Sequence, residues 1–321
     1  MKDLEDFPQI ELQNAIEEFY TSLTESKIPV LTPHSHLPGG QGGAGKTTIH
    51  DIIQENNSNV IVIDGDRFRE RHPNFEIIQN LYGNEAADYT QKFSNSIVNA
   101  LIERLSSEKY NLVIEGTCRT SEVPLNTAKV LKDKGYTVEL SVMCTDKDIS
   151  WQSTIDRYNE MKRIGLLARA VPKEKYLETV NAISANISTI YQSNIFDEIT
   201  LYNREKQCLY RFSETPEINP SNIVDKMLNE IERKRNLLTE SDEILKNNPH
   251  LQKAVIQFEN DYLKDKLHGI SEPEQIRLRF NARNAAIKSD PELYKAYKSA
   301  KNQFKTPAKG LQKNEKPKHR R

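Results

Sequence analysis

Two patterns of apolar residues alternate along the first part of the chain. Short continuous runs of β-branched residues are typical of strands buried on both faces of a sheet. Apolar residues three or four positions apart indicate helices with one buried face. The runs predict strands at residues 60–63, 112–114, 138–143 and 199–202. Helices are predicted by five spaced sets: Leu12, Ile16, Phe19 and Leu23; Ile49, Ile52 and Ile53; Phe93, Ile97, Leu101 and Leu105; Leu125, Ala128 and Leu131; Val180, Ile183, Ile187 and Ile190.

The order of these elements predicts the fold class and a domain boundary. Strands that alternate with helices over short connections predict an α/β fold with an open, mostly parallel sheet and helices on both faces. We place this domain at residues 1–236. Beyond it only helical spacing remains, so residues 237–300 are predicted to be an all-helical appendage. Residues 301–321 are expected to be a basic, disordered tail.

Charge and composition change this picture at the C-terminus only. The last 21 residues hold eight Lys or Arg and one acid, Glu315, whereas the whole chain has a net charge of −1. We therefore expect no binding to nucleic acid except weak binding through the tail. The three cysteines, Cys118, Cys144 and Cys208, are too few and too scattered for a disulfide framework. No apolar run reaches the ~20 residues of a membrane span, so we expect a cytoplasmic protein without membrane contact.

A glycine-rich loop carries the first chemical signal. It follows the pattern G-x-x-x-x-G-K-[ST], which is typical of loops that bind the phosphates of a nucleotide. Glycines allow the backbone N–H groups to turn inwards, and the following helix adds its positive N-terminal end. Lys46 would reach the β- and γ-phosphates, and Thr47 would bind Mg²⁺. The loop predicts ATP as ligand and nine contact residues: Gly40, Gln41, Gly42, Gly43, Ala44, Gly45, Lys46, Thr47 and Thr48.

The segment before the loop does not fit this interpretation as well. Residues 34–38 contain two histidines and a proline, which is a poor composition for a buried strand. We expect Pro38 to lie at the very end of any strand there. His34, His36, His50 and His72 have no metal-ligand spacing, and His72 is interpreted as structural.

Five further segments, together with the loop, resemble the zeta toxins of bacterial toxin–antitoxin systems. They keep their order and spacing over residues 30–235, and this resemblance implies a P-loop kinase-like fold. The segments are Val60-Ile61-Val62-Ile63-Asp64-Gly65-Asp66 with Arg71-His72-Pro73-Asn74-Phe75, Asn111 to Thr120, Asp156-Arg157-Tyr158, Ala168-Arg169-Ala170 and Leu201-Tyr202-Asn203-Arg204-Glu205.

The resemblance implies an activity and a partner. Zeta toxins are kinases that phosphorylate the 3′-hydroxyl of the sugar in UDP-N-acetylglucosamine, and a protein antitoxin normally blocks their site. By resemblance, Asp66 is the base that accepts the proton of the sugar hydroxyl. It lies just after a buried strand, where ligands bind in open α/β sheets. Asp64 is the alternative, although it could instead cap a helix.

Other site residues are expected around this base. Glu115 ends a buried strand and would support the metal together with Thr47, with a structural salt bridge as the alternative. The resemblance implies that Arg157 and Arg169 act on the phosphates, whereas Lys162 and Arg163 could be an exposed helix face. It also implies that the sugar nucleotide is contacted by Thr117, Arg119 and Thr120.

One departure from the family leaves alternatives open. Asn99 stands where the family tends to carry an acid for the substrate, and asparagine has no charge. We therefore keep two other hypotheses: a P-loop kinase for another hydroxyl-bearing small molecule, such as an antibiotic, and an ATPase that transfers no phosphate to a small molecule. The appendage could be a solubilising or dimerising extension, a cover that inhibits the nucleotide cleft, or an arm for nucleic acid or secretion.

Overall fold

The computed structural model describes residues 4–165 and 170–305, which divide into two compact units. The first unit ends at Asn229, and the second begins at Glu230. The predicted boundary at residue 236 falls inside helix α10, Glu230–Lys246. The helix therefore belongs to the second unit from its first residue.

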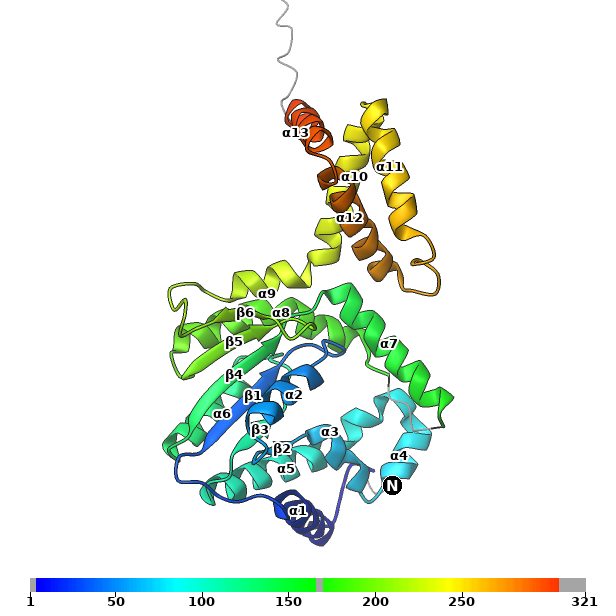
Figure 1. Cartoon of the computed structure of the whole chain (residues 1–321). Helices are drawn as coiled ribbons and strands as arrows, with labels where there is room; N and C mark the ends of the chain where they lie inside the picture. Colours follow the sequence, from blue (N-terminus) through cyan, green and yellow to red (C-terminus); the bar gives the residue numbers. More distant parts are fainter. Residues whose placement is uncertain (1–3, 166–169, 306–321) are drawn as a thin grey trace, which may run out of the picture. The chain divides into compact units, whose positions relative to one another are not determined.

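The first unit is built on an open sheet of six strands (Figure 1). Their order is β2-β3-β1-β4-β5-β6, and all neighbours are parallel except β5 and β6. This confirms the predicted fold class. The four predicted strands correspond to β2, β3, β4 and β5, whereas β1 was expected only as a poor strand and β6 was not anticipated. The strands are β1 His34–Gly39, β2 Ile61–Ile63, β3 Leu112–Ile114, β4 Thr137–Met143, β5 Glu198–Tyr202 and β6 Cys208–Arg211.

The polar segment with the proline, β1, lies in the middle of the sheet. Pro38 is the second-last residue of the strand and is in register with Ser141 of β4. On the other side, β3 pairs with β1 only at Ser35 and His36. Proline has no N–H to donate, and here it lies beyond the part of β1 that pairs with β3. Its carbonyl oxygen still accepts a hydrogen bond from the Gly116 N–H at 3.0 Å.

Helices cover both faces of the sheet, as predicted. Successive residues of a strand point to opposite faces, so the apolar strands supply buried side chains to the helices on each side. Leu112 and Ile114 of β3 belong to the larger core, together with the buried face of α5. Val113 points the other way and packs with Ile49 and Ile53 of α2. The helices of this unit are α1 Gln9–Thr24, α2 Thr47–Asn56, α3 Gly65–Phe68, α4 Phe75–Tyr82, α5 Ala86–Ser107, α6 Glu122–Asp133, α7 Lys147–Arg163, α8 Lys173–Ser193 and α9 Ser221–Leu228, with short 3-10 turns η1 Arg69–Arg71 and η2 Gly83–Glu85.

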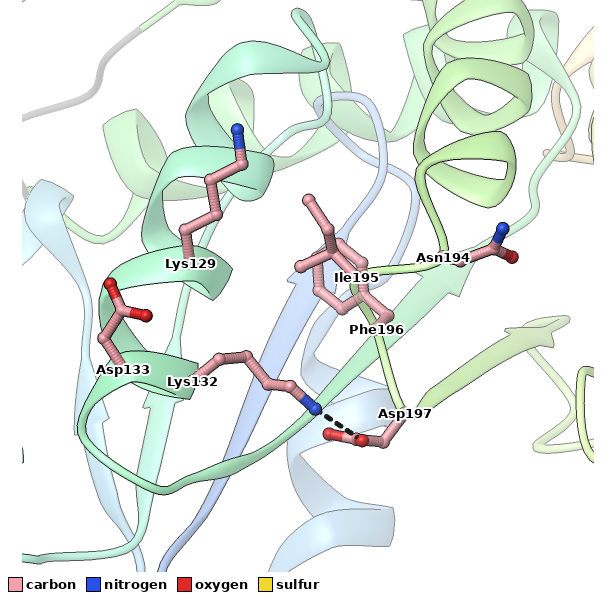
Figure 2. A pocket seen from close by; sticks show the side chains of 7 residues that line it. All are labelled: Lys129, Lys132, Asp133, Asn194, Ile195, Phe196 and Asp197. Atoms are coloured by element: carbon pink, nitrogen blue, oxygen red, sulfur yellow. Dashed lines mark hydrogen bonds and ion pairs between the residues drawn. The ribbon is translucent and has the colours of Figure 1, made fainter.

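A surface pocket of about 390 Å³ lies between α6 and the segment that leads into β5 (Figure 2). Lys132 donates to Asp197 at 2.6 Å, and Asp197 also accepts the Val138 N–H at 2.8 Å. Asp197 and Val138 mark the amino ends of β5 and β4. The pocket is therefore at the edge of the parallel sheet opposite to the one where α/β proteins bind ligands.

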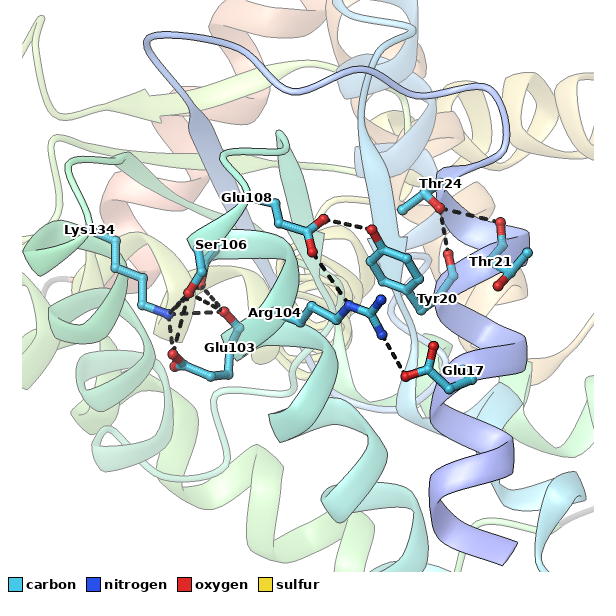
Figure 3. Close-up of polar contacts among 10 residues, drawn as sticks. Glu17, Tyr20, Thr21, Thr24, Glu103, Arg104, Ser106, Glu108 and Lys134 are labelled. Carbon is cyan, nitrogen blue, oxygen red and sulfur yellow. Dashed lines mark hydrogen bonds and ion pairs between the residues drawn. The ribbon is translucent and has the colours of Figure 1, made fainter. Parts of the chain in front are cut away.

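Polar side-chain contacts join the N-terminal helix α1 to α5 (Figure 3). Tyr20 donates from its hydroxyl to Glu108 at 2.7 Å, and Arg104 donates to Glu17 at 2.7 Å. The Arg104 guanidinium carbon also lies 3.4 Å from the centre of the Tyr20 ring. Apolar burial of Leu12 adds to these contacts. The predicted first helix is thus an integral part of the first unit.

The second unit contains only helices over its described residues, as predicted for the C-terminal region. Its small core includes Ile244, Val255 and Ile287. Arg283 is buried among these helices and forms ion pairs with Asp242, at 2.9 Å, and with Glu259. Its helices are α10, α11 Pro249–Leu263, α12 Glu272–Lys288 and α13 Pro291–Lys305. In the described parts of both units, no helix combines the length and the apolar character needed to cross a membrane.

Candidate active site

The glycine-rich loop joins β1 to α2 and has the backbone shape that its motif requires. Gly40, Gly43 and Gly45 have φ angles of +139°, +71° and +94°, which L side chains rarely adopt. At Gly43 an added Cβ would also lie 2.0 Å from the carbonyl oxygen of Ser150. This position has no space for a side chain, so glycine is required there. A cradle of this form fits the phosphates of a nucleotide.

Two predicted contact residues anchor the loop with their own groups. The Gln41 side chain is 1% exposed and donates to the Thr145 carbonyl at 2.7 Å and to Ser150 Oγ at 3.0 Å. The Ala44 side chain is fully buried, and the Ala44 N–H bonds the carbonyl of Gln41 at 3.1 Å. The side chains of Gln41 and Ala44 therefore face the protein and not the space in front of the loop.

Arg204, which follows β5, is a site residue that the sequence did not single out. It donates from Nη2 to the Gly43 carbonyl and to Ser153 Oγ at 2.9 Å. It also donates from Nε to the Ala44 carbonyl at 3.2 Å, and Thr145 donates to the same oxygen at 2.7 Å. The loop carbonyls are thus bound on the protein side. Arg204 lies in one of the segments that resemble zeta toxins, and this was the only available signal.

Lys46, Thr47 and Thr48 lie where the loop becomes a helix. Lys46 is the residue before α2 and donates from Nζ to the Gly40 carbonyl at 3.3 Å. Thr47 is exposed at the first position of α2. The Thr48 N–H donates a hydrogen bond to the Gly45 carbonyl at 3.0 Å, so the Thr48 hydroxyl is the group left to donate to a ligand. The positive end of α2 faces the loop.

Acidic residues at the carboxyl ends of two neighbouring strands meet next to this loop. Asp64 and Asp66 follow β2, and Glu115 follows β3, which pairs with β2 in parallel. The pKa of Glu115 is raised to about 7, chiefly by burial and in smaller part by the charges of Asp64 and Asp66. The charges of Lys46 and Arg157 act on the same carboxyl group and lower its pKa. Residues from four separate parts of the chain therefore share one electrostatic environment.

His50 completes the surroundings of Glu115. Its Nε2 lies 3.2 Å from Glu115 Oε1, but the two atoms do not form a hydrogen bond, and Nε2 is buried. Burial lowers the pKa of His50, and the charge of Lys46 lowers it further, whereas the charges of Asp64 and Asp51 act against this shift. The imidazole is therefore neutral at physiological pH. Sequence spacing gave no reason to connect His50 with Glu115.

The two aspartates after β2 have different surroundings. Asp64 precedes α3, and its side chain accepts the Asp66 N–H at 2.9 Å, which confirms the interpretation of Asp64 as a helix cap. The Asp66 side chain is 57% exposed, and its Oδ1 accepts from Arg69 Nε at 3.0 Å. Of the two, Asp66 has the carboxyl group that a ligand can reach.

Arg157 and Arg169 were expected to act on the phosphates. Arg157 is exposed on α7 and close enough to act on Glu115. Arg163, farther along the helix, is exposed and paired with Glu160 at 2.6 Å, so it belongs to the solvent-facing surface as the alternative interpretation held. Lys162 lies against the Tyr158 ring. Arg169 lies outside the described residues.

The loop after β3 presents three of the predicted substrate residues. Thr117, Arg119 and Thr120 are exposed. Between them, Cys118 is buried at a φ angle of +54°, and burial raises the pKa of its thiol to about 12, so it is not a nucleophile at neutral pH. Asn186 of α8 donates to the carbonyls of Cys118 and Arg119 at 3.0 and 2.7 Å. This asparagine fixes the loop conformation.

Asn99 and the remaining histidines complete the predicted positions. Asn99 is exposed on α5, the helix whose Ser94 donates to the Gly65 carbonyl at 2.5 Å. His72 is buried between the rings of Phe7 and Phe93, which confirms its structural role. His36 lies 3.4 Å from Glu139 on the sheet. Within residues 4–165 and 170–305, no cluster of three or more His, Cys, Asp or Glu could hold a metal ion.

Comparisons with known proteins agree with this geometry. The zeta toxin family model matches residues 20–215. Toxin zeta of Streptococcus agalactiae is 38% identical over 231 residues, covering 71% of this chain and 80% of that protein. Toxin PezT of Streptococcus pneumoniae is 41% identical over 210 residues, covering 65% and 83%. A solved structure from the PezAT chromosomal toxin–antitoxin system of Streptococcus pneumoniae is 36% identical with a TM-score of 0.64, covering 70% of this chain and 89% of its own. The chain therefore belongs to the zeta toxin family.

Proposed function

We propose that this protein is an ATP-dependent kinase that phosphorylates the 3′-hydroxyl of the sugar in UDP-N-acetylglucosamine. The observation that carries the proposal is the environment of Glu115. Lys46 of the phosphate loop, Asp66 and Arg157 all act on that one carboxyl group. A phosphate loop, a carboxylate for an acceptor hydroxyl and an arginine for the transferred group are the parts that phosphoryl transfer needs.

The loop and its helix would bind the triphosphate. Inward N–H groups, the positive end of α2 and the Lys46 ammonium group together favour negative charge. The positive φ angle at Gly43 supports this assignment, because this backbone conformation is one that glycine allows in loops whose N–H groups turn inwards. Binding energy of this sort holds the γ-phosphate in a fixed position relative to the acceptor.

Thr47 and Glu115 are the residues that would hold Mg²⁺. The donor set fits a hard cation, because both offer oxygen atoms and the phosphates would supply further oxygens. When bound, Mg²⁺ neutralises the charge that develops on the phosphates. Glu115, with a pKa of about 7, would release its proton more readily beside such a cation.

Asp66 would orient the acceptor and take its proton. The sugar 3′-oxygen forms a bond to the γ-phosphorus, the bond between that phosphorus and the β–γ bridging oxygen breaks, and ADP leaves. The proton of the hydroxyl passes to the Asp66 carboxylate. Arg157 would stabilise the charge on the phosphoryl oxygens, and the family resemblance adds Arg169 to this role.

The exposed polar residues Thr117, Arg119, Thr120 and Asn99 would contact the nucleotide sugar. The threonines and Asn99 can form hydrogen bonds with a neutral sugar, and the positive charge of Arg119 can bind the diphosphate of the UDP group. Because one solved relative comes from a toxin–antitoxin system, we further propose that the protein acts as a toxin against cell-wall synthesis and that a protein antitoxin restrains it.

The test is a direct assay of the purified protein. It is incubated with ATP, Mg²⁺ and a panel of UDP-sugars, and the products are read by mass spectrometry and located on the sugar by NMR. We expect a single added phosphate on the 3′-hydroxyl of UDP-N-acetylglucosamine. Transfer to a different small molecule would support the alternative kinase that Asn99 keeps open. Hydrolysis of ATP without any phosphorylated acceptor would overturn both.

A further inference from the structure

We propose that Arg69 is a positioning residue that holds the Asp66 carboxylate in place for the acceptor hydroxyl. The inference rests on the proposed function and adds a residue to its machinery. Arg69 lies in the short η1 turn directly after α3, three residues beyond Asp66. Its Nε donates to Asp66 Oδ1 at 3.0 Å.

The surroundings of Arg69 differ from those of an ordinary surface arginine. The Arg69 side chain is only 10% exposed, whereas the Asp66 side chain is 57% exposed. The rest of the guanidinium group is bound by the beginning of α5. Nη1 donates to the Ala87 carbonyl at 2.6 Å and to Thr90 Oγ1 at 3.2 Å, and Nη2 donates to Gln91 Oε1 at 2.7 Å.

This arrangement makes the arginine the fixed partner of the pair. Three bonds to α5 hold the guanidinium group without any help from Asp66, so the ion pair does not have to order two flexible side chains. A carboxylate that accepts from an immobile donor loses rotamer freedom itself. The bond therefore acts on Asp66 and orients its carboxyl group.

The backbone beneath Asp66 is fixed by separate contacts. The Asp66 N–H bonds the Asp64 side chain at 2.9 Å, and Ser94 Oγ bonds the Gly65 carbonyl at 2.5 Å. Both Ser94 and the partners of Arg69 belong to α5. One helix thus holds the main chain and the side chain of the proposed base, and this is the rigid support that a catalytic group requires.

Lysine could not replace arginine in this position. The guanidinium group is planar and presents donors on both of its edges, so it can bond Asp66 on one side and α5 on the other. An ammonium group is a single point with three donors and a flexible stem, and it could not span both sets of acceptors. The variant Arg69→Lys keeps the charge and removes the geometry.

The kinetic test compares Arg69→Lys with Arg71→Lys. Arg71 belongs to the same turn but is exposed and bonds Glu18 of α1 at 2.6 Å, so it is the matched control. We expect Arg69→Lys to lower kcat by roughly 10- to 100-fold, the range that a misplaced catalytic group costs. The KM values for ATP and for UDP-N-acetylglucosamine should change by less than about threefold. Arg71→Lys should keep both parameters.

A double-mutant cycle separates positioning from a general structural effect. If Arg69 acts through Asp66, Arg69→Lys should cause no further loss of kcat in the Asp66→Asn background. Losses that multiply would overturn the proposal, as would an unchanged kcat in Arg69→Lys. A fall in kcat that is accompanied by an equal loss of ATP binding would also count against it, because it would indicate a distorted site.

A crystal structure of Arg69→Lys tests the inference without any activity. We expect the Asp66 carboxyl group to be displaced or to occupy more than one rotamer, while the backbone of residues 64–68 is unchanged. An Asp66 carboxyl group in its original position would refute the positioning role, even if the kinase proposal holds. Absence of phosphoryl transfer by the unmodified protein would refute the kinase proposal and leave this structural result readable.

Discussion

Arg204 donates a hydrogen bond from Nε to the carbonyl oxygen of Ala44 at 3.2 Å, across 160 positions of the sequence. A second bond joins Arg204 Nη2 to the Gly43 carbonyl. A loop that binds phosphates must direct its N–H groups to the ligand and its carbonyls away from it. Arg204 stabilises that orientation by binding two of the carbonyls.

The first prediction follows from this clamp. Arg204→Ala should weaken ATP binding by about 10- to 100-fold, because hydrogen bonds to a charged group contribute about 1.5–3 kcal/mol. Binding is measured by calorimetry with ATP and Mg²⁺. The control is Arg211→Ala, which removes an arginine at the end of β6 that pairs with Glu214. ATP affinity within twofold of the original protein in Arg204→Ala would show that the clamp is dispensable.

The second prediction separates nucleotide binding from transfer. Lys46→Ala should abolish phosphoryl transfer, and Asp66→Asn should lower kcat by about 10²- to 10⁴-fold and leave a measurable residual rate. Only Lys46→Ala should markedly weaken ATP binding. Lys46 acts on the phosphates, whereas Asp66 acts on the acceptor. Turnover and calorimetry are measured on both variants. Normal turnover in Asp66→Asn would remove the assignment of this carboxylate as the base.

The third prediction concerns Gly43. Gly43→Ala should destabilise the first unit, because its φ of +71° is unfavourable for alanine and the new Cβ would lie 2.0 Å from the Ser150 carbonyl oxygen. Backbone strain of this kind costs about 1–3 kcal/mol, and the steric clash adds to it. Gly42→Ala is the matched control, since its Cβ would meet the nearest atom at 3.7 Å. Urea denaturation of both variants decides the point; equal midpoints would contradict the structure of the loop.

The fourth prediction is a pH dependence of stability through His72. Burial lowers the pKa of His72 below its usual value of 6.5. The unfolded chain therefore takes up a proton at this residue at a higher pH than the folded protein does. The His72 contribution to the unfolding free energy should fall as the pH decreases through about 6.5, because the unfolded state then binds more protons at this residue. The raised pKa of Glu115 acts in the opposite direction over the same pH range. Denaturation by urea at several pH values between 8 and 5 measures the slope.

The variant His72→Asn isolates this contribution. In the folded protein, His72 Nδ1 accepts the Asn74 N–H at 3.1 Å, and an asparagine oxygen can accept the same bond without titrating. The unfolding free energy of the variant should therefore rise relative to that of the original protein as the pH falls from 8 to 5. The remaining slope contains a contribution of the same sign from His50, whose pKa burial also lowers, and one of the opposite sign from Glu115. An identical slope in His72→Asn would show that His72 is not a source of the acid sensitivity.

The fold and the centre of the site could be predicted from local sequence patterns together with the family resemblance. Continuous apolar runs predicted β2, β3, β4 and β5, because a strand between two helical layers must be apolar on both faces. Helical spacing predicted the buried face of α5. The motif at residues 40–47 predicted glycine at positions where the backbone has a positive φ angle. The family resemblance supplied Asp66 and Arg157, and the position after a buried strand supplied Glu115. In the structure, the charges of Asp66 and Arg157 both act on the Glu115 carboxyl group.

Other features depended on contacts that no local pattern encodes. β1 has the composition of a poor strand, yet it lies in the middle of the sheet because its partners on β3 and β4 supply the pairing. The approach of His50 to Glu115, and of Arg204 to Ala44, joins side chains that are far apart in sequence.

The sequence by itself determined the periodicity of the elements, the sites that only glycine can occupy and the residue types available for chemistry. These depend on local sterics and on which face of an element is apolar. Only the tertiary structure decided which arginine holds the phosphate loop, which one holds Asp66 and how strongly burial changes the acidity of Glu115. Hydrogen-bond geometry and desolvation depend on distances in space, and these distances exist only once the chain has folded.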